Sequence, residues 1–377
     1  MIDTNLRYVI AMLDGFGLDY YEKSYMPRLK KLASENFFKK GKAIFPTLTN
    51  ANNISIVCGS WPETHGVTTN CYLDEATGDM RYLEDPSFLR SPTLFEVAKS
   101  HGLRSALLTG KAKTLGILGG CVDFGVAAQE PDEKIIKRYG SPPDIYSSEV
   151  NLWLWKVALD LLENRRDISV IYVHTTDYAM HRWAPEEAES LDHLAAIDSL
   201  MGHAADIGSD AIFLVTADHG MNAKKRCLDL HKISQEAGIP VRFSLSPVAD
   251  RLLKHHSGYG GAAYVYLEEH ANRDSVMEFI AGIPGVEECL PRELAAQRYH
   301  LMAERIGDIV IAADRETVFG TLDGNSRELP EGYRNHGSHH EDVIPLIAWG
   351  PEQVFKGSDE VLYNFDLTRS VFFRAQS

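Results

Sequence analysis

Two short segments of the sequence place a carboxylate near an imidazole directly after an apolar run. "DYAMH" contains Asp177 and His181 and follows "SVIYVHTT", whereas "TADHG" contains Asp218 and His219 and follows "DAIFLV". Either pair alone is more typical of a loop acid and a surface histidine. Because the same arrangement occurs twice, and Asp14 also follows an apolar run, the residues together favour a shared metal site.

The expected position of the three acids explains why a metal would be needed. The carboxyl ends of parallel strands meet at one edge of an open α/β sheet, so Asp14, Asp177 and Asp218 should converge there. Three carboxylates in proximity raise one another's pKa unless a cation lies between them. Mixed carboxylate and imidazole ligands suit zinc, with manganese or iron as alternatives, and the acids could hold two ions. The competing interpretation is that individual acids cap the helices that follow.

A hydroxyl group comes from a third segment, "FPTLTNANNISIVCGSW". After Thr49, the residues "NANNISIVCGSW" predict a helix that stops near Gly59. A threonine in this place often serves only as the helix N-cap. The N-terminus of a helix also offers free N–H groups and a positive dipole end to an anion. A hydroxyl bound to metal there would be a competent nucleophile for phosphorus.

Buried apolar runs alternate with amphipathic stretches along the chain, as in sheets whose parallel strands are covered by helices on both faces. The predicted strands span residues 7–14, 104–109, 169–177, 211–218, 308–314 and 343–349. Between two of them, the stretch that begins at Pro185 has helical spacing of its apolar residues. These features predict an open α/β sheet.

The segment after "TADHG" is long enough for an inserted cap. It contains two predicted strands, "IPVRFSL" and "GAAYVYLE", and two predicted helices, in "RDSVMEFIAGI" and "PRELAAQRYHLMAER". We therefore expect a catalytic core formed by residues 1–224 and 306–377, and a small α+β cap domain formed by residues 225–305. Within the cap, His255 and His256 are expected to be ordinary loop residues.

Composition and charge restrict the setting and the partners. The chain has 377 residues, of which 44% are hydrophobic, so it can bury the core of one large domain plus an insertion. We expect a cytoplasmic protein with reduced thiols, because the five cysteines lack CxxC spacing and neither a secretion signal nor a membrane helix is apparent. The net charge of -15 argues against nucleic acid or a membrane as partner. A small anionic substrate would need a locally positive site. The sequence leaves the oligomeric state, including a homodimer, open.

The order of these residues resembles the two-zinc core of the alkaline phosphatase superfamily, in its nucleotide pyrophosphatase/phosphodiesterase branch. Within that branch, "TNANNISIVCG", "GKAK", "TTDYAMH", "TADHGMNAK" and "YRNHG" are similar to segments of the phosphonoacetate hydrolases. The resemblance covers most of the chain and is weakest between residues 225 and 305. It implies an alkaline phosphatase-like core with a largely parallel central sheet.

The resemblance also implies two sets of zinc ligands. The first set consists of Asp177, His181 and His336. The second set consists of Asp14, Asp218 and His219, together with the hydroxyl oxygen of Thr49. "HGSHH" offers His339 and His340 as alternatives to His336, and the His-Gly pair of the family motif favours His336. His65 matches no ligand and is expected to be a loop histidine.

Further roles follow from the same resemblance. Asn70 would donate its side-chain amide to a phosphoryl oxygen, and Lys111 and Lys113 of "TGKAK" would bind a substrate carboxylate. Without the resemblance, such a lysine pair is more typical of a solvated loop. The implied function, in phosphonate catabolism, is hydrolysis of the carbon–phosphorus bond of phosphonoacetate to acetate and phosphate through a phosphothreonine at Thr49. The alternative is a phosphodiesterase or nucleotide pyrophosphatase on the same metals, whose leaving group needs no carboxylate clamp.

Overall fold

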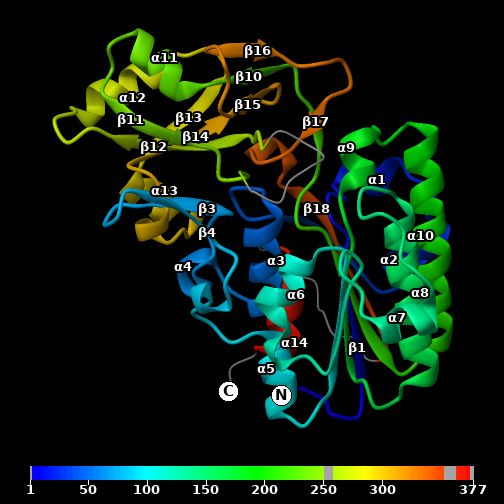
Figure 1. Cartoon of the computed structure of the whole chain (residues 1–377). Helices are drawn as coiled ribbons and strands as arrows, with labels where there is room; N and C mark the ends of the chain where they lie inside the picture. The colour runs from blue at the N-terminus through cyan, green and yellow to red at the C-terminus, as the bar shows by residue number, and fades with distance from the viewer. Residues whose placement is uncertain (1, 250–257, 352–361, 374–377) are drawn as a thin grey trace.

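The structure is a computed structural model that describes residues 2–249, 258–351 and 362–373 (Figure 1). Its core is a seven-stranded sheet in the order β2-β18-β8-β1-β7-β5-β6. The strands are β1 (Arg7–Met12), β2 (Phe37–Lys42), β5 (Ser105–Thr109), β6 (Phe124–Ala127), β7 (Val170–His174), β8 (Ala211–Thr216) and β18 (Val343–Trp349). Five neighbouring strands, from β8 to β6, run parallel, whereas β18 is antiparallel to both β8 and β2. The predicted α/β fold with a largely parallel sheet is confirmed.

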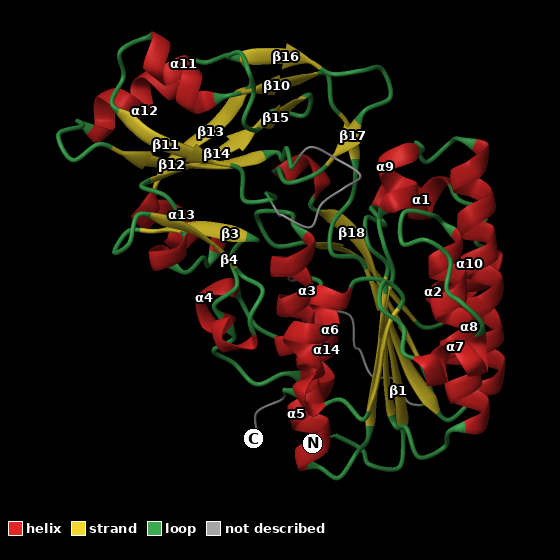
Figure 2. Cartoon of the chain, viewed as in Figure 1, coloured by secondary structure: helices red, strands yellow, loops and turns green. Residues whose placement is uncertain are grey.

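Helices cover both faces of this sheet (Figure 2). One face carries α2 (Pro27–Glu35), α7 (Glu133–Tyr139), α8 (Glu149–Asn164) and α10 (Ala188–Ile207), and the other carries α3 (Thr49–Cys58), α5 (Leu94–Ser100), α6 (Ala112–Leu118) and α14 (Asp366–Phe372). Every residue of β1, β7 and β8 is buried. This burial on both faces is why these strands are continuous apolar runs in the sequence.

Shorter elements connect the core to its surroundings. They are α1 (Leu18–Lys23), α4 (Pro62–His65), α9 (Tyr178–Arg182), the hairpin β3 (Cys71–Asp74) and β4 (Asp79–Tyr82), and the pair β9 (Asn222–Ala223) and β17 (Arg334–Asn335). Short 3-10 turns lie at 86–88, 119–121, 303–305 and 339–341. No helix in the described residues combines the length and apolarity that a bilayer crossing requires. All five cysteines have free thiols.

A second, smaller layer lies beyond the carboxyl edge of the core sheet (Figure 1). It contains a four-stranded antiparallel sheet, β11-β12-β14-β13, formed by β11 (Val241–Leu245), β12 (Ala262–Leu267), β13 (Val286–Pro291) and β14 (Ile309–Ala313). A three-stranded sheet, β15-β10-β16, is formed by β10 (Arg226–Leu228), β15 (Thr317–Phe319) and β16 (Ser326–Glu328). The helices of this layer are α11 (Leu230–Glu236), α12 (Arg273–Ala281) and α13 (Arg292–Tyr299).

One predicted core strand belongs to this layer instead. Residues 308–314 were expected to return the chain to the core sheet, but β14 pairs with β12 and β13. The assignment to the core sheet is wrong because β14, buried at every position, has the same apolar pattern as a core strand. The division at residue 306 stays a prediction, and the pairing of β15 and β16 with β10 favours a later boundary.

Candidate metal centre and active site

The three predicted acids lie together at the carboxyl edge of the core sheet. Asp14 follows β1, Asp177 follows β7 and Asp218 follows β8, and their residues are 0%, 3% and 0% exposed. Asp177 occupies the N-cap position of α9, but its side chain makes no capping hydrogen bond to that helix. Capping therefore does not explain the burial of this carboxylate.

Two groups of three side chains could each hold a metal ion. Within each group, the potential ligand atoms all lie within 4.8 Å of one another. One group is Asp14, Asp218 and His219, which is the predicted second ligand set. His219 Nε2 lies 3.3 Å from Asp218 Oδ2 and 3.7 Å from Asp14 Oδ1. Asp218 Oδ1 accepts hydrogen bonds from the backbone N–H groups of Gly15 and His219, at 3.0 and 2.9 Å. These bonds orient Asp218 and leave its buried Oδ2 without a hydrogen-bond partner.

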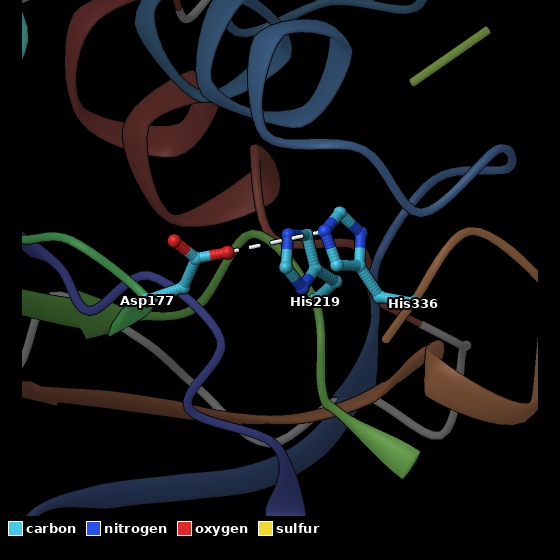
Figure 3. Close-up of side chains that lie close together, drawn as sticks. All are labelled: Asp177, His219 and His336. Carbon is cyan, nitrogen blue, oxygen red and sulfur yellow. Dashed lines mark ion pairs between the residues drawn. The ribbon is translucent and has the colours of Figure 1, made fainter. Parts of the chain in front are cut away.

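The other group is Asp177, His219 and His336, which differs from the predicted first set by one member (Figure 3). His336 Nε2 is 3.9 Å from Asp177 Oδ2. The rings of His219 and His336 stack with centroids 3.7 Å apart and planes 10° apart. The remaining predicted ligand, His181, places Nε2 2.9 Å from Asp177 Oδ2, and its ring centroid is 5.5 Å from that of His336. All six predicted protein ligands are therefore brought into one cluster.

The three imidazoles are held through the same ring nitrogen. Nδ1 of His181, His219 and His336 each lies within hydrogen-bond distance of a backbone carbonyl oxygen, at 2.9, 2.9 and 2.7 Å. A carbonyl oxygen can only accept, so Nδ1 must carry the proton. A ring that is neutral in this tautomer presents Nε2 as a lone pair, which is the form that coordinates a metal. The donor set therefore fits divalent metal ions such as zinc.

Thr49 lies beside these groups at the start of α3. The helix begins at Thr49 with Leu48 as N-cap, and no side chain caps it. The alternative interpretation, that Thr49 merely caps its helix, is therefore contradicted. Its Oγ1 lies 3.4 Å from His219 Nε2 and 3.5 Å from Asp14 Oδ1. The helix ends where predicted, at Gly59, whose φ of 57° is left-handed. The hydroxyl thus combines a position among ligand atoms with a helix N-terminus, where an anion is stabilised.

The pKa shifts in the cluster favour a bound cation. Burial, followed by the neighbouring carboxylates Asp177 and Asp218, raises the pKa of Asp14 to about 6. Burial likewise raises the pKa of Asp218 to about 6. Burial and the adjacent rings of His219 and His181 hold the pKa of His336 well below its usual range. Cations at this edge would lower the carboxylate pKa values and coordinate the neutral imidazoles.

Lys111 contributes a protein cation at the same edge. It is the N-cap residue of α6, two residues beyond the end of β5, and its Nζ lies 3.5 Å from Asp14 Oδ2. Burial alone would lower the pKa of Lys111, but Asp14, Asp177 and Asp218 raise it above its usual value. Lys113 lies in the first turn of α6 and is partly buried. Lys111 therefore reaches the site, as the strand position predicted, whereas a substrate contact of Lys113 stays a prediction.

Asn70 is held differently from the other predicted residues. Its side-chain Nδ2 donates to the carbonyl oxygen of Val248 at 3.0 Å, and its Oδ1 is buried without a hydrogen-bond partner. Its backbone N–H donates to the carbonyl of Pro247. The amide is thus tied to the segment between β11 and β12, and its predicted contact with a phosphoryl oxygen stays a prediction.

The structure adds His174 to the cluster. It ends β7, is 1% exposed, and places Nε2 3.7 Å from Asp14 Oδ2. Its Nδ1 lies 3.3 Å from the hydroxyl of Thr109 at the end of β5. His174 was not among the predicted site residues, although a histidine within the apolar run "SVIYVH" is unusual enough to be a signal.

Three other histidines considered from the sequence, His339, His340 and His65, make their contacts outside the ligand groups. His339 Nε2 is 3.5 Å from Glu288 Oε2, and His340 Nε2 is 2.5 Å from Glu287 Oε2, so both pair with β13. His65 ends α4 and is fully buried rather than a loop residue. Its side chain lies 2.8 Å from Ser55 Oγ and braces α3. His255 and His256 lie outside the described residues.

The fold and the buried donor groups define an α/β protein whose sheet edge carries two groups of side chains that could hold metal ions. The sequence model described as "Type I phosphodiesterase / nucleotide pyrophosphatase" matches residues 8–342, and the chain belongs to this family. Among curated relatives, the ectonucleotide pyrophosphatase/phosphodiesterase C27A7.3 of Caenorhabditis elegans is 24% identical over 91% of this chain. The bis(5'-adenosyl)-triphosphatase ENPP4 of Homo sapiens is 23% identical over 87% of it. The chain spans only 43% and 69% of the lengths of these two relatives.

Solved structures provide a stronger likeness. The crystal structure of phosphonoacetate hydrolase from Sinorhizobium meliloti 1021 in complex with phosphonoformate is 28% identical, with a TM-score of 0.88. The comparison covers 97% of this chain and 95% of that one. The complex of the same enzyme with phosphonoacetate gives a TM-score of 0.87. The murine ectonucleotide pyrophosphatase/phosphodiesterase 5, at 18% identity and a TM-score of 0.69, shares the fold.

Proposed function

We propose that the protein is a two-zinc hydrolase that cleaves the carbon–phosphorus bond of phosphonoacetate to acetate and phosphate. The observation that carries the proposal is the position of Thr49. Its hydroxyl lies at the N-terminus of α3, within 3.5 Å of a carboxylate and an imidazole that belong to one ligand group. The likeness to phosphonoacetate hydrolase over nearly the whole chain supports the choice of substrate.

The chain's own residues would hold the two ions. Asp14, Asp218 and His219 would hold one ion, with the Thr49 oxygen beside it. The ligands of the other ion would be Asp177, His181 and His336. When bound, zinc would acidify hydroxyl groups and neutralise charge on the phosphoryl oxygens.

Thr49 would act as the nucleophile in the first displacement. Its oxygen forms a bond to phosphorus as the phosphorus–carbon bond breaks, and the electron pair of that bond leaves with the carbon. The N-terminal N–H groups of α3 offer donors to the phosphoryl oxygens. Asn70 is proposed to supply a further donor. The product of this step is a phosphothreonine, and the proton lost from the Thr49 hydroxyl is balanced by the proton that the departing carbon gains to become acetate.

The lysine pair would make carbon a feasible leaving group. A carbanion survives only if its charge spreads into the adjacent carboxylate as an enediolate. Lys111 and Lys113 would stabilise that charge, which develops in the transition state and is smaller in the ground state. Water then attacks phosphorus from the side that acetate vacated, breaks the bond to the Thr49 oxygen and releases phosphate.

A phosphodiesterase or nucleotide pyrophosphatase is the second candidate, and family membership favours it. Such an enzyme would use the same ligands and nucleophile, but its oxygen leaving group would not need the lysines. The catalytic efficiencies for phosphonoacetate and for an activated aryl phosphodiester separate the two functions.

The experiment is an assay of the zinc-loaded protein with a panel of phosphonates, monoesters and diesters. We expect phosphonoacetate to have the highest kcat/KM, with equal amounts of acetate and phosphate released. Thr49→Ala should abolish release of both, whereas Thr49→Ser should keep a measurable rate. A preference for diesters over phosphonoacetate would reject the proposed substrate, and full activity of Thr49→Ala would reject the proposed nucleophile.

A further inference from the structure

A fully buried ion pair connects the segment that follows His219 with the segment that follows His336. Lys224 Nζ is 2.8 Å from Glu341 Oε1, and both side chains are 0% exposed. Neither residue belongs to the ligand groups. Removing two charges from water costs several kcal/mol per ion unless hydrogen bonds satisfy both groups. The bonds around this pair are therefore informative.

Glu341 uses both carboxylate oxygens to join two segments that carry metal ligands. Oε1 accepts from Lys224 Nζ and from Asn222 Nδ2, each at 2.8 Å. Both donors lie just beyond His219. Oε2 accepts from the backbone N–H and the hydroxyl of Ser338, at 2.9 and 2.8 Å. Ser338 lies two residues after His336.

Backbone hydrogen bonds reinforce the same junction. The N–H of Gly220 donates to the carbonyl oxygen of Glu341 at 2.8 Å. Asn222 Nδ2 also donates to the carbonyl of His340 at 2.8 Å, and β9 pairs with β17 directly before His336. The stacked rings of His219 and His336 thus belong to two segments that Glu341 connects.

The junction extends to the segment that carries the nucleophile. The hydroxyl of Thr47 donates to the carbonyl of Ser338 at 2.9 Å and accepts from the N–H of Gly337 at 2.9 Å. The carbonyl of Thr47 holds the Nδ1 of His336 at 2.7 Å. Thr47 is two residues before Thr49, so the segment that Glu341 holds through Ser338 also contacts the segment that carries the nucleophile.

We propose that Glu341 and its partner Lys224 form a positioning pair that holds the three segments bearing the nucleophile and the metal ligands in register. The pair touches no ligand atom and acts through Ser338 and Asn222. Residues that orient metal ligands typically change metal affinity 10- to 100-fold when replaced. The role as support for a metal centre rests on the proposed function, whereas the effect on the three segments does not.

The test uses Glu341→Gln, which keeps the size of the side chain but leaves Lys224 buried without its counter-charge. The control is Asp198→Asn. Asp198 is a buried carboxylate on α10 that accepts from the backbone N–H groups of Arg28 and Leu29, on the sheet face that carries α2. Zinc affinity is measured by competition with a chromogenic chelator. Amide hydrogen exchange is measured in the protein with and without zinc.

We expect Glu341→Gln to weaken zinc binding about 10- to 100-fold. Amide exchange should accelerate in residues 47–52, 219–224 and 334–342 and stay native elsewhere. Asp198→Asn should leave zinc affinity native and accelerate exchange only around α2 and α10. Native zinc affinity together with native exchange in the three segments of Glu341→Gln would overturn the inference.

A second variant guards against loss of folding. The double replacement Lys224→Met with Glu341→Leu removes both charges, and such apolar replacements often preserve stability. It should fold, yet still bind zinc more weakly and exchange faster in the three segments. A folded double variant with native values would overturn the inference. If the wild-type protein hydrolyses no phosphonoacetate, the proposed function fails, but the exchange comparison still decides the inference.

Discussion

The ammonium group of Lys111 lies 3.5 Å from Oδ2 of Asp14, at the edge where β5 and β1 end. The lysine side chain is 29% exposed, whereas the aspartate side chain is completely buried. Lys111 therefore extends from partial solvent exposure into the ligand cluster. A substrate bound beside Asp14 would lie close to this cation.

Replacing Lys111 with Ala should affect substrates selectively. We expect kcat/KM for phosphonoacetate to fall roughly 100- to 1000-fold, the usual effect of removing one group that stabilises developing charge. An activated aryl phosphodiester should lose less than about tenfold, since its leaving group carries no carboxylate. Lys113→Ala should show the same pattern.

The control for both variants is Lys134→Ala, which removes an exposed lysine from α7. Steady-state kinetics on the two substrates provide the measurement. Equal losses on both substrates would contradict a carboxylate-binding role. Such a result would indicate that Lys111 serves the metal centre itself.

Acid should stabilise the metal-free protein through Asp14 and Asp218. Their pKa values of about 6 lie above the ordinary value of 3.8, so the folded state holds protons that the unfolded state releases. Burying these two carboxylates in their ionised form lowers the free energy of unfolding. This loss of stability is fully present above pH 6 and disappears as the pH falls through 6 toward 4. The comparison is with the double variant Asp14→Asn and Asp218→Asn. As the pH is lowered from about 7.5 to about 5.5, the Tm of the metal-free wild-type protein should rise relative to that of the double variant.

In the zinc-loaded protein, lowering the pH should reduce the stabilisation that zinc provides, because protons compete with the metal for the same carboxylates. The stabilisation by zinc should therefore shrink over the same interval. Scanning calorimetry with and without zinc measures both effects. A wild-type Tm that tracks the double variant at every pH would show that the two acids are not perturbed.

The convergence of the three acids could be predicted because each lies within three residues of the end of a strand that is buried on both faces. The same reasoning failed for β14, since an apolar run does not reveal which sheet it joins. It also missed β2 and β6. β2 reads "FFKKGK", and lysines are common on edge strands because they discourage further pairing. His174 was missed because its proximity to Asp14 and Thr109 depends on the pairing of β7 with both β1 and β5.

The segment that carries His336 should not tolerate a side chain at Gly337. Its φ is 118°, and a Cβ there would lie 2.6 Å from the backbone nitrogen of Gly261. We expect Gly337→Ala to lower the free energy of unfolding by more than about 3 kcal/mol, and to weaken zinc binding, because strain and a backbone clash combine. Gly332 has a φ of 78° and no atom within 4 Å of a Cβ, so Gly332→Ala should cost only about 1–2 kcal/mol.

Urea denaturation and zinc competition on the two glycine variants supply the measurement. Similar losses of stability in both variants would mean that the positive φ alone, without the clash with Gly261, accounts for the destabilisation of Gly337→Ala. Native zinc affinity in Gly337→Ala would mean that the close approach of this segment to Gly261 does not position His336.

Removal of metal should destabilise the protein and abolish catalysis reversibly. Without cations, Asp14, Asp177 and Asp218 are buried beside one another, and binding to the folded state alone adds stability by mass action. After chelator dialysis, zinc at 100 times its Kd should restore about 2.7 kcal/mol per site.

Asp218→Asn should recover only part of this gain, because it removes a ligand of one site and leaves the Asp177 site complete. Activity and the free energy of unfolding should return together as zinc is titrated to two ions per chain. Full activity in the dialysed protein, or saturation without any gain in stability, would contradict a two-metal centre built on these acids.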